Sequence, residues 1–273
     1  NQRINNALSI SGGPFMNQIP AAKPPTEYVL DPDVYPHVDH IETEDDTPVD
    51  NIYSERQMRL LVDPLYSSWP GPGDGRPFLA MANVGLFFGL RMDPVVPDVM
   101  LSLDVVPDQD MTNKENLAYF IWVLGKAPDV VIEIVSNKKG GEDDTKLAIY
   151  ARLGISYYII WDPREFLKSG KLRVFCLEGR SYRPQTETWL TDVGLGLTTW
   201  TGNFEGLHQL WLRWCDKSGT LLLTGEERAE QEKQRAEQEK QRAEQEKQRA
   251  EQEKQRAEKL AEKLRQLGVD PNA

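Results

Sequence analysis

The sequence predicts an α/β domain followed by a long charged helix. Two apolar segments rich in β-branched residues, 95–103 and 128–136, have the length of strands. A segment with helical spacing and then another short apolar strand follow the second of them, and this order predicts a parallel crossover. Near the end of the sequence a seven-residue unit repeats four times from Arg228, with Ala as its only apolar residue, which predicts a solvated helix.

Length and composition divide the chain into three parts. A chain of 273 residues is long enough for one substantial domain and an appendage, and its apolar residues concentrate between Ile52 and Leu223. We therefore expect an acidic, largely disordered arm over 1–50, a globular domain over 51–224 and a charged helix over 225–273.

Charge and cysteine content narrow the class of protein. The net charge is −11. The stretch from Glu27 to Asp50 contains many carboxylates and no Lys or Arg, so nucleic acid would repel it. Two cysteines, Cys176 and Cys215, fit reduced thiols packed in a core. No apolar run approaches the ~20 residues that span a bilayer. We expect a cytoplasmic protein that does not bind membranes.

The first half of the domain contains a helix and two strands. Apolar residues at helical spacing from Ile52 to Leu65, behind a cap at Asp50, predict a helix that ends near Pro70. The apolar segment 78–90 and the segment 95–103 then predict strands.

The segment 128–136 has the pattern of a buried central strand. From Val130 to Val135 alternate residues are apolar on both faces, with one exception, Glu133. After the glycines at 140–141, apolar residues at helical spacing predict a helix that Gly154 ends. A strand at 157–161, a hairpin formed by 171–177 and 181–191, and a short strand near 194–199 complete the expected order.

The repeat helix has a weak association seam. If Ala229 and its equivalents take one seam position, the partner position is Glu232 and its equivalents, which disfavours tight packing. A true apolar seam occurs only near the end of the helix. A helix with an association tip and a purely solvated spacer are both consistent with this pattern. The seam residues are Ala257, Leu260, Leu264 and Leu267.

Two acidic residues within apolar strands are hard to explain by structure alone. An ionised Glu133 in a buried strand is costly unless it meets a cation, and Asp98 lies in the other strand after Pro97. If these strands are neighbours, both carboxylates converge on one hard divalent ion, Mg²⁺ or Mn²⁺. A second pair, His37 and His40, has too few ligands to indicate a metal site.

The motifs around these acids resemble a known family. The string from Pro128 to Ser136 is followed by Glu142, Lys146 and the segments 150–155 and 157–163, with a further acidic motif at 96–99. In order and spacing, over residues 47–223, this string is similar to the Uma-type restriction-endonuclease-like family, a branch of the PD-(D/E)XK nuclease superfamily. The resemblance implies a mixed central sheet flanked by helices and a Mg²⁺-dependent phosphodiesterase site.

Carried over to this chain, the resemblance implies that Asp98 and Glu133 bind the metal. The superfamily's lysine usually lies two residues after the second acid, where this chain has Val135, and the residue that matches the substitute lysine on the following helix is Lys146. We prefer Lys146 to Lys138 and Lys139. Lys146 is then expected to orient or deprotonate the attacking water, or to neutralise the phosphate.

Two more acids are candidate site residues, but each also has an ordinary structural explanation. Glu142 matches an acid of the family pattern but also suits the first turn of a helix, and Glu55 could be a metal ligand or a surface residue of the first helix.

Three functions remain open at this stage. The first is a DNA-cleaving, Mg²⁺-dependent endonuclease, which a local excess of basic residues favours despite the overall acidity. The second is a catalytically silent nuclease fold that acts in protein binding or assembly, with the C-terminal helix forming a homo-oligomer. The third is a protein-binding scaffold without a metal. The basic residues are Lys114, Lys126, Lys138, Lys139, Lys146, Arg152, Lys168, Lys171 and Arg173.

Overall fold

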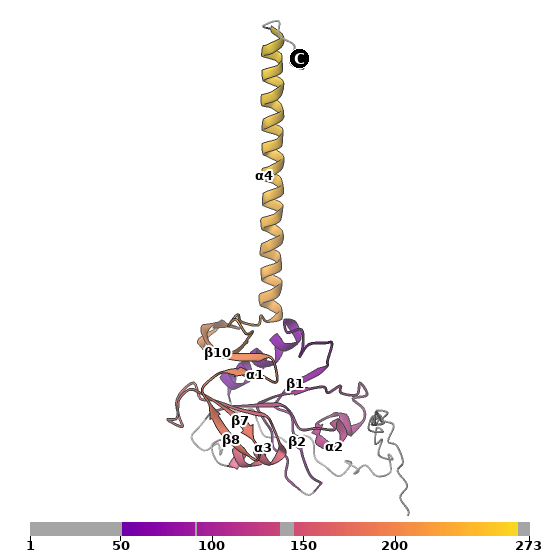
Figure 1. Ribbon diagram of the computed structural model, residues 1–273, viewed down its shortest axis with the longest axis vertical. Coiled ribbons are helices and arrows are strands. Elements are labelled where there is room, and N and C mark those ends of the chain that lie inside the picture. Colours follow the sequence, from indigo (N-terminus) through magenta and orange to yellow (C-terminus); the bar gives the residue numbers. More distant parts are fainter. Residues whose placement is uncertain (1–50, 91, 137–144, 267–273) are drawn as a thin grey trace, which may run out of the picture. The chain divides into compact units, whose positions relative to one another are not determined.

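The computed structural model describes residues 51–90, 92–136 and 145–266 (Figure 1). The expected N-terminal arm, with His37 and His40, lies outside the described residues. Lys138, Lys139 and Glu142 lie outside them as well.

A mixed six-stranded sheet forms the centre of the domain. Its strands are β1 (Phe78–Ala82), β3 (Val99–Leu103), β5 (Val130–Ile134), β6 (Tyr157–Trp161), β7 (Leu172–Glu178) and β8 (Ser181–Gln185), in the spatial order β1-β3-β5-β6-β7-β8. Neighbours are antiparallel except β5 and β6, which are parallel and are joined through α3 (Leu147–Leu153). The predicted α/β class, the crossover and the edge hairpin are confirmed.

The remaining elements surround this sheet. A three-stranded antiparallel sheet contains β9 (Trp189–Leu190), β10 (Leu195–Phe204) and β11 (Leu207–Cys215), and β2 (Leu86–Phe87) pairs in parallel with β4 (Tyr119–Phe120). The helices are α1 (Ile52–Ser67), η2 (Lys114–Asn116), α2 (Ile121–Leu124), α3 and α4 (Gly225–Gln266). None of the helices within the described ranges combines the length and apolarity needed to cross a membrane.

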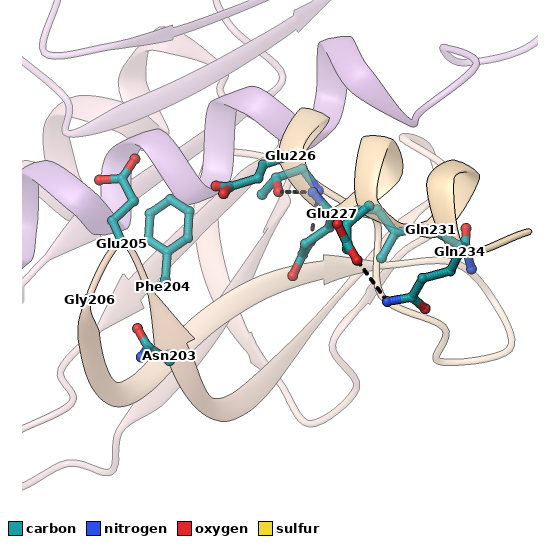
Figure 2. Close-up of a pocket in the computed structure, with 11 residues that line it drawn as sticks. Asn203, Phe204, Glu205, Gly206, Glu226, Glu227, Gln231 and Gln234 are labelled. Carbon is teal, nitrogen blue, oxygen red and sulfur yellow. Dashed lines mark hydrogen bonds between the residues drawn. The ribbon is translucent and has the colours of Figure 1, made fainter. Parts of the chain in front are cut away.

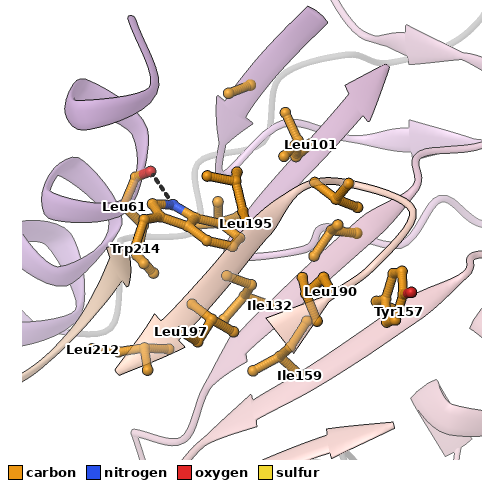
Figure 3. Close-up of a cluster of buried hydrophobic side chains, with 14 of the residues drawn as sticks. Leu61, Leu101, Ile132, Tyr157, Ile159, Leu190, Leu195, Leu197, Leu212 and Trp214 are labelled. Carbon is orange, nitrogen blue, oxygen red and sulfur yellow. Dashed lines mark hydrogen bonds between the residues drawn. The ribbon is translucent and has the colours of Figure 1, made fainter. Parts of the chain in front are cut away.

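One face of the six-stranded sheet is covered by α1 and the three-stranded sheet. Even-numbered residues of β5, such as Ile132, pack there with Leu61 of α1 and Leu197 of β10, as Figure 3 shows. The Trp214 indole Nε1 donates a 2.7 Å hydrogen bond to the carbonyl of Leu61, so a buried polar group is satisfied inside this cluster (Figure 3). We call this side the α1 face.

The opposite face of the sheet packs against α3 and β2. Val131 of β5 and Val135, directly after β5, lie there with Tyr150 of α3, Leu86 of β2 and Tyr158 of β6. We call this side the α3 face. Since Glu133 alternates with Ile132 and Ile134, it belongs to the α3 face.

Three sequence predictions need correction. The segment 78–90 is two strands rather than one, because Asn83 has a left-handed backbone (φ 55°) that ends β1. Asn51, not Asp50, caps α1, since its side chain accepts a hydrogen bond from the Ser54 amide. The short strand expected near 194–199 is the first half of the ten-residue strand β10, which forms a hairpin with β11.

The long charged helix is present as α4, and its first turn is fixed to the domain. Thr224 and Glu227 form a reciprocal capping box, and both oxygens of Glu227 also accept from the buried Arg213 guanidinium at 2.6 and 2.7 Å. From Arg228 to Leu260 every side chain is exposed. The apolar tip predicted from Ala257 onward is described only in part, and Leu260 is 60% exposed.

Candidate active site

Glu133 is a buried carboxylate on the α3 face, near the end of β5. The residue is 1% exposed, and its neighbours on the same face are Val131 of β5 and Val135, directly after the strand. β5 is a central strand between β3 and β6, and its two faces are covered by the apolar clusters of the α1 face and the α3 face. The sequence pattern therefore predicted the burial of this acid correctly.

Asp98 lies opposite Glu133, directly before β3. The β3–β5 ladder pairs Val99 with Ile132, so the next residues outward, Asp98 and Glu133, face each other on the α3 face. The Asp98 Oδ2 atom accepts a 2.6 Å hydrogen bond from the backbone amide of Ile134. This bond ties the Asp98 carboxylate to β5 where the backbone ladder ends.

The helix α3 places two polar groups over Glu133. Lys146 precedes the first turn of α3 and Tyr150 lies four residues later, so both side chains project from the same side of the helix. The Lys146 Nζ lies 2.6 Å from Glu133 Oε2, and the Tyr150 hydroxyl donates to Oε1 at 2.6 Å. Both oxygens of the buried carboxylate thus receive a hydrogen bond.

Burial dominates the protonation of this cluster. The pKa of Glu133 is raised to about 7, first by loss of solvent around the carboxyl and also by the neighbouring Asp98 charge, although Lys146 and the Tyr150 hydrogen bond act to lower it. The pKa of Tyr150 is raised, first by burial and then by the charge of Glu133. A carboxyl with this pKa exchanges its proton near neutral pH, as functional carboxyls often do.

The donor atoms suit a hard cation. Two carboxylates facing each other are the ligand type that Mg²⁺ and Mn²⁺ prefer, and a cation between them would offset the charge repulsion that raises the Glu133 pKa. Within residues 51–90, 92–136 and 145–266 no three or more His, Cys, Asp or Glu side chains cluster as metal ligands would. Any metal bound here would need backbone oxygens, water or substrate to complete its coordination.

The structure does not bring Glu55 to these residues. Glu55 lies on α1, which packs against the α1 face through Met58, Leu61 and Leu65, and its Oε1 pairs with Arg59 at 2.8 Å. The sheet therefore separates Glu55 from Glu133. The other additional candidate, Glu142, lies outside the described residues.

The basic residues predicted near the site are dispersed. Lys126 pairs with Asp129 at 2.6 Å, at the start of β5, about 13 Å along the strand from Glu133. Lys168 and Lys171 are exposed in the turn before β7. Val135, which takes the usual lysine position, is 3% exposed and packs in the apolar cluster of the α3 face.

Tyr150 was not among the predicted site residues. Its position four residues after Lys146 was the available signal, because that spacing places both side chains over one point of the sheet. Tyr150 also fits the apolar side of the helix pattern, so the pattern alone does not indicate that its hydroxyl donates to a carboxylate.

A separate groove of about 640 Å³ lies between the β10–β11 turn and the first turns of α4, as Figure 2 shows. Its lining includes Glu205, Glu226, Glu227 and Glu230, and Glu205 is already paired with Arg56 and Arg59. This acidic lining does not suit a polyanion.

Comparison with known proteins gives one finding. The family model "Uma2: Putative restriction endonuclease" matches residues 45–203, more than half of the chain. The matched range contains all of the residues at the site described above. No curated protein matches the chain.

Proposed function

The chain belongs to the Uma2 family, and on this premise we propose that it hydrolyses DNA phosphodiester bonds with the help of a divalent metal ion. The family description indicates a nuclease, and restriction-endonuclease-like families usually depend on a metal. The observation that carries the proposal is the meeting of Asp98, Glu133 and Lys146 at one end of β5.

Asp98 and Glu133 would hold the metal, which we propose to be Mg²⁺, with Mn²⁺ as a substitute. The carbonyl of Ile134 is a third candidate donor, because a strand residue directs its amide and carbonyl to the same side and the Ile134 amide points to Asp98. When bound, the ion would supply charge stabilisation at the phosphate and a more acidic water.

The protein side chains supply position and charge. Lys146 carries its positive charge beside Glu133 Oε2, where it would neutralise charge that develops on the phosphate or hold a water molecule by hydrogen bonding. Tyr150 fixes the other oxygen of Glu133, and the Ile134 amide fixes Asp98. Groups held in this way do not need to reorganise when the substrate arrives.

A plasmid cleavage assay with Mg²⁺ tests the proposal. Glu133→Gln and Asp98→Asn keep the size of each side chain and remove its charge, and each is expected to reduce cleavage by about a thousandfold or more, since metal binding contributes several kcal/mol. Glu55→Gln is the matched control, because it removes a carboxylate from the other face of the sheet. Cleavage that survives both site substitutions would rule out this site.

Metal binding by itself separates the nuclease from its alternatives. Calorimetry with Mn²⁺ should give heat that disappears in Asp98→Asn and stays in Glu55→Gln. A folded protein that binds Mn²⁺ through Asp98 but cuts no DNA would instead favour a silent nuclease fold.

The observation that favours this second function is the row of exposed side chains on α4 from Arg228 to Leu260, which leaves the helix available for assembly. Homo-oligomer formation through α4 belongs to this alternative. Sedimentation of the wild-type chain and of Leu260→Glu would show whether the tip associates.

A further inference from the structure

Arg152 is an exposed residue of α3, the helix that places Tyr150 over Glu133. It lies on the solvent side of the helix together with Ala148, one turn earlier, which is exposed as well. Among the described residues, its contacts are to an aromatic ring and to a thioether, and no carboxylate forms an ion pair with it. The positive charge of Arg152 is therefore exposed and is not neutralised within this part of the chain.

The guanidinium of Arg152 is held in place without being covered. Its Cζ atom lies 5.9 Å from the centroid of the Phe88 ring, a cation–π contact, and its Nη2 atom lies 3.9 Å from the Sδ atom of Met92. The ring contacts the flat face of the guanidinium, whereas the five N–H donors point outward from its edge. Because the residue is exposed, this edge is open to a ligand from solvent. A planar guanidinium fixed in this way can bind a phosphate through two parallel hydrogen bonds.

The side chains that hold Arg152 belong to the loop that leads into Asp98. This loop follows β2 and closes where the backbones of Leu86 and Val95 exchange hydrogen bonds of 2.7 and 3.2 Å. Asp98 lies three residues further along the chain. Arg152 therefore connects the two segments that supply Asp98 and Lys146 to the site.

The spacing allows one DNA strand to contact both the site and Arg152. Lys146 lies six residues before Arg152, so the two backbones are about 9 Å apart along the helix. The Lys146 side chain is 28% exposed and that of Glu133 only 2%, so the site meets solvent at Lys146. Each strand of a DNA duplex carries one phosphate about every 3.4 Å along the axis. A distance of about 9 Å therefore corresponds to about two or three phosphates.

We propose that Arg152 binds a phosphate of the DNA strand about two or three positions from the phosphodiester cleaved at Asp98 and Glu133, and that Phe88 positions its guanidinium. This inference rests on the proposed nuclease function and names one contact through which the substrate is held. It also gives the substrate a positive charge beyond Lys146, on a chain whose net charge is −11.

The test combines steady-state cleavage of a short duplex with binding at a series of salt concentrations. Arg152→Gln retains most of the side-chain length without the charge, and Arg152→Lys retains the charge without the two-pronged geometry. Phe88→Leu keeps an apolar side chain and removes the ring that faces the guanidinium. Binding is measured in the Glu133→Gln background, where the proposed function predicts no cleavage.

The matched control is Arg183→Gln on β8. The Arg183 side chain is 70% exposed, and the residue pairs across the sheet with Cys176, which packs on the α1 face. This control therefore removes an exposed arginine from the opposite face of the sheet.

The expected result for Arg152→Gln is a rise of about tenfold or more in KM with a smaller change in kcat, and a salt-dependence slope of binding lowered by about 1. Arg152→Lys should fall between Arg152→Gln and the wild type. Phe88→Leu should raise KM by about threefold and leave the salt slope unchanged, because it keeps the charge. Arg183→Gln should match the wild type in both measurements.

Thermal unfolding of each variant separates this role from a structural one. If Arg152 only fastens the loop to α3, Arg152→Gln lowers the unfolding temperature without altering the salt slope, and the inference is wrong. If Arg152→Gln does not fold, an unchanged KM and salt slope in Arg152→Lys excludes the contact equally.

The remaining outcomes distinguish the inference from the proposed function. If the wild type cleaves DNA and Arg152→Gln behaves as Arg183→Gln does, the nuclease stands and the role of Arg152 is excluded. If the folded wild type binds DNA without cleaving it and Arg152→Gln lowers the salt slope, the contact is supported and the cleavage proposal fails. If the folded wild type neither binds nor cleaves DNA, both proposals fail.

Discussion

β5 sends alternate side chains to the two faces of the central sheet, and both sets are buried, but only one set is entirely apolar. On the α1 face Val130, Ile132 and Ile134 pack among other aliphatic and aromatic residues. On the α3 face Glu133 interrupts the same kind of cluster, with Lys146 above it. One strand therefore serves stability on one side and carries ionisable groups on the other.

The buried side chains on the two faces make contributions of opposite sign to the stability of the fold. Burying a side chain such as Ile132 stabilises the fold by about 1.5–3 kcal/mol. Holding a carboxyl at a pKa of about 7 instead of 4.5 disfavours its charged form by about 3 kcal/mol. A buried acid that costs about as much as a neighbouring isoleucine contributes is best explained by chemistry that needs it, and four substitutions test this comparison.

Lys146→Ala should have the largest effect. We expect cleavage to fall by about a hundred- to ten-thousandfold, the range for a positioned group that assists proton transfer or stabilises charge. The variant should also raise the pKa of Glu133 above its value of about 7, because Lys146 lowers that pKa. Initial rates with a plasmid substrate measure the loss, with the exposed Lys217→Ala as control. A rate within threefold of the wild type would remove Lys146 from the site.

Ile132→Ala should affect the stability of the protein and leave its chemistry intact. Ile132 is fully buried on the α1 face, so the truncation leaves a cavity that lowers the free energy of unfolding by about 2–5 kcal/mol. Urea denaturation measures the change, and Ile132→Val should cost only about 0.5–1.5 kcal/mol. Cleavage per folded molecule should match the wild type. A large loss of rate in folded protein would show that the two faces are not independent.

Glu133→Gln should change how stability depends on pH in metal-free buffer. Because the folded-state pKa of about 7 lies above the ordinary value of 4.5, the folded protein holds this proton more tightly than the unfolded chain. The stabilising contribution of the protonated group is complete below pH 4.5 and is lost as the pH rises through 7. Glutamine mimics the protonated carboxyl, so the variant should exceed the wild type in stability above pH 7, by up to about 3 kcal/mol, and match it near pH 4.

Chemical denaturation of the two proteins at several pH values measures this difference. Equal stability of both proteins across the whole range would contradict the burial of a charged Glu133.

The sequence was informative where local pattern determines the outcome. Two-sided apolar alternation identified β5 as a central strand, and it marked Glu133 as an anomaly because no periodicity accounts for a buried acid. The position of Asp98 opposite Glu133 could be stated only as a condition, since it requires β3 and β5 to be neighbours. Glu133 pairs with Ile160 of β6, and Ile160 pairs with Arg173 of β7. These two registers join separate strands, and no local pattern specifies them.

The hairpin of β10 and β11 shows the opposite case, in which the local pattern misled. Gly202 inside β10 argues against a strand by propensity, yet the ring of Trp200 folds over that position so closely that a Cβ atom would overlap it. The turn at Glu205 and Gly206 has positive φ values of 46° and 79°, as a tight hairpin requires, but Glu is not a residue that predicts such a turn. Packing of the Trp200 ring explains the glycine, and the turn residue Glu205 forms ion pairs with Arg56 and Arg59 that no local pattern indicates.

Glu55→Gln should have the smallest effect, and it tests whether the location of a carboxylate, rather than its presence, decides its role. Glu55 is a partly exposed acid on α1 that pairs with Arg59, and exposed ion pairs of this kind contribute about 0.2–1 kcal/mol at most. We expect the free energy of unfolding to change by about 0.5 kcal/mol or less, as measured by urea denaturation. A gain in stability as large as that of Glu133→Gln would mean that the location of a carboxylate does not decide its effect, because Glu55 retains solvent and an ion-pair partner.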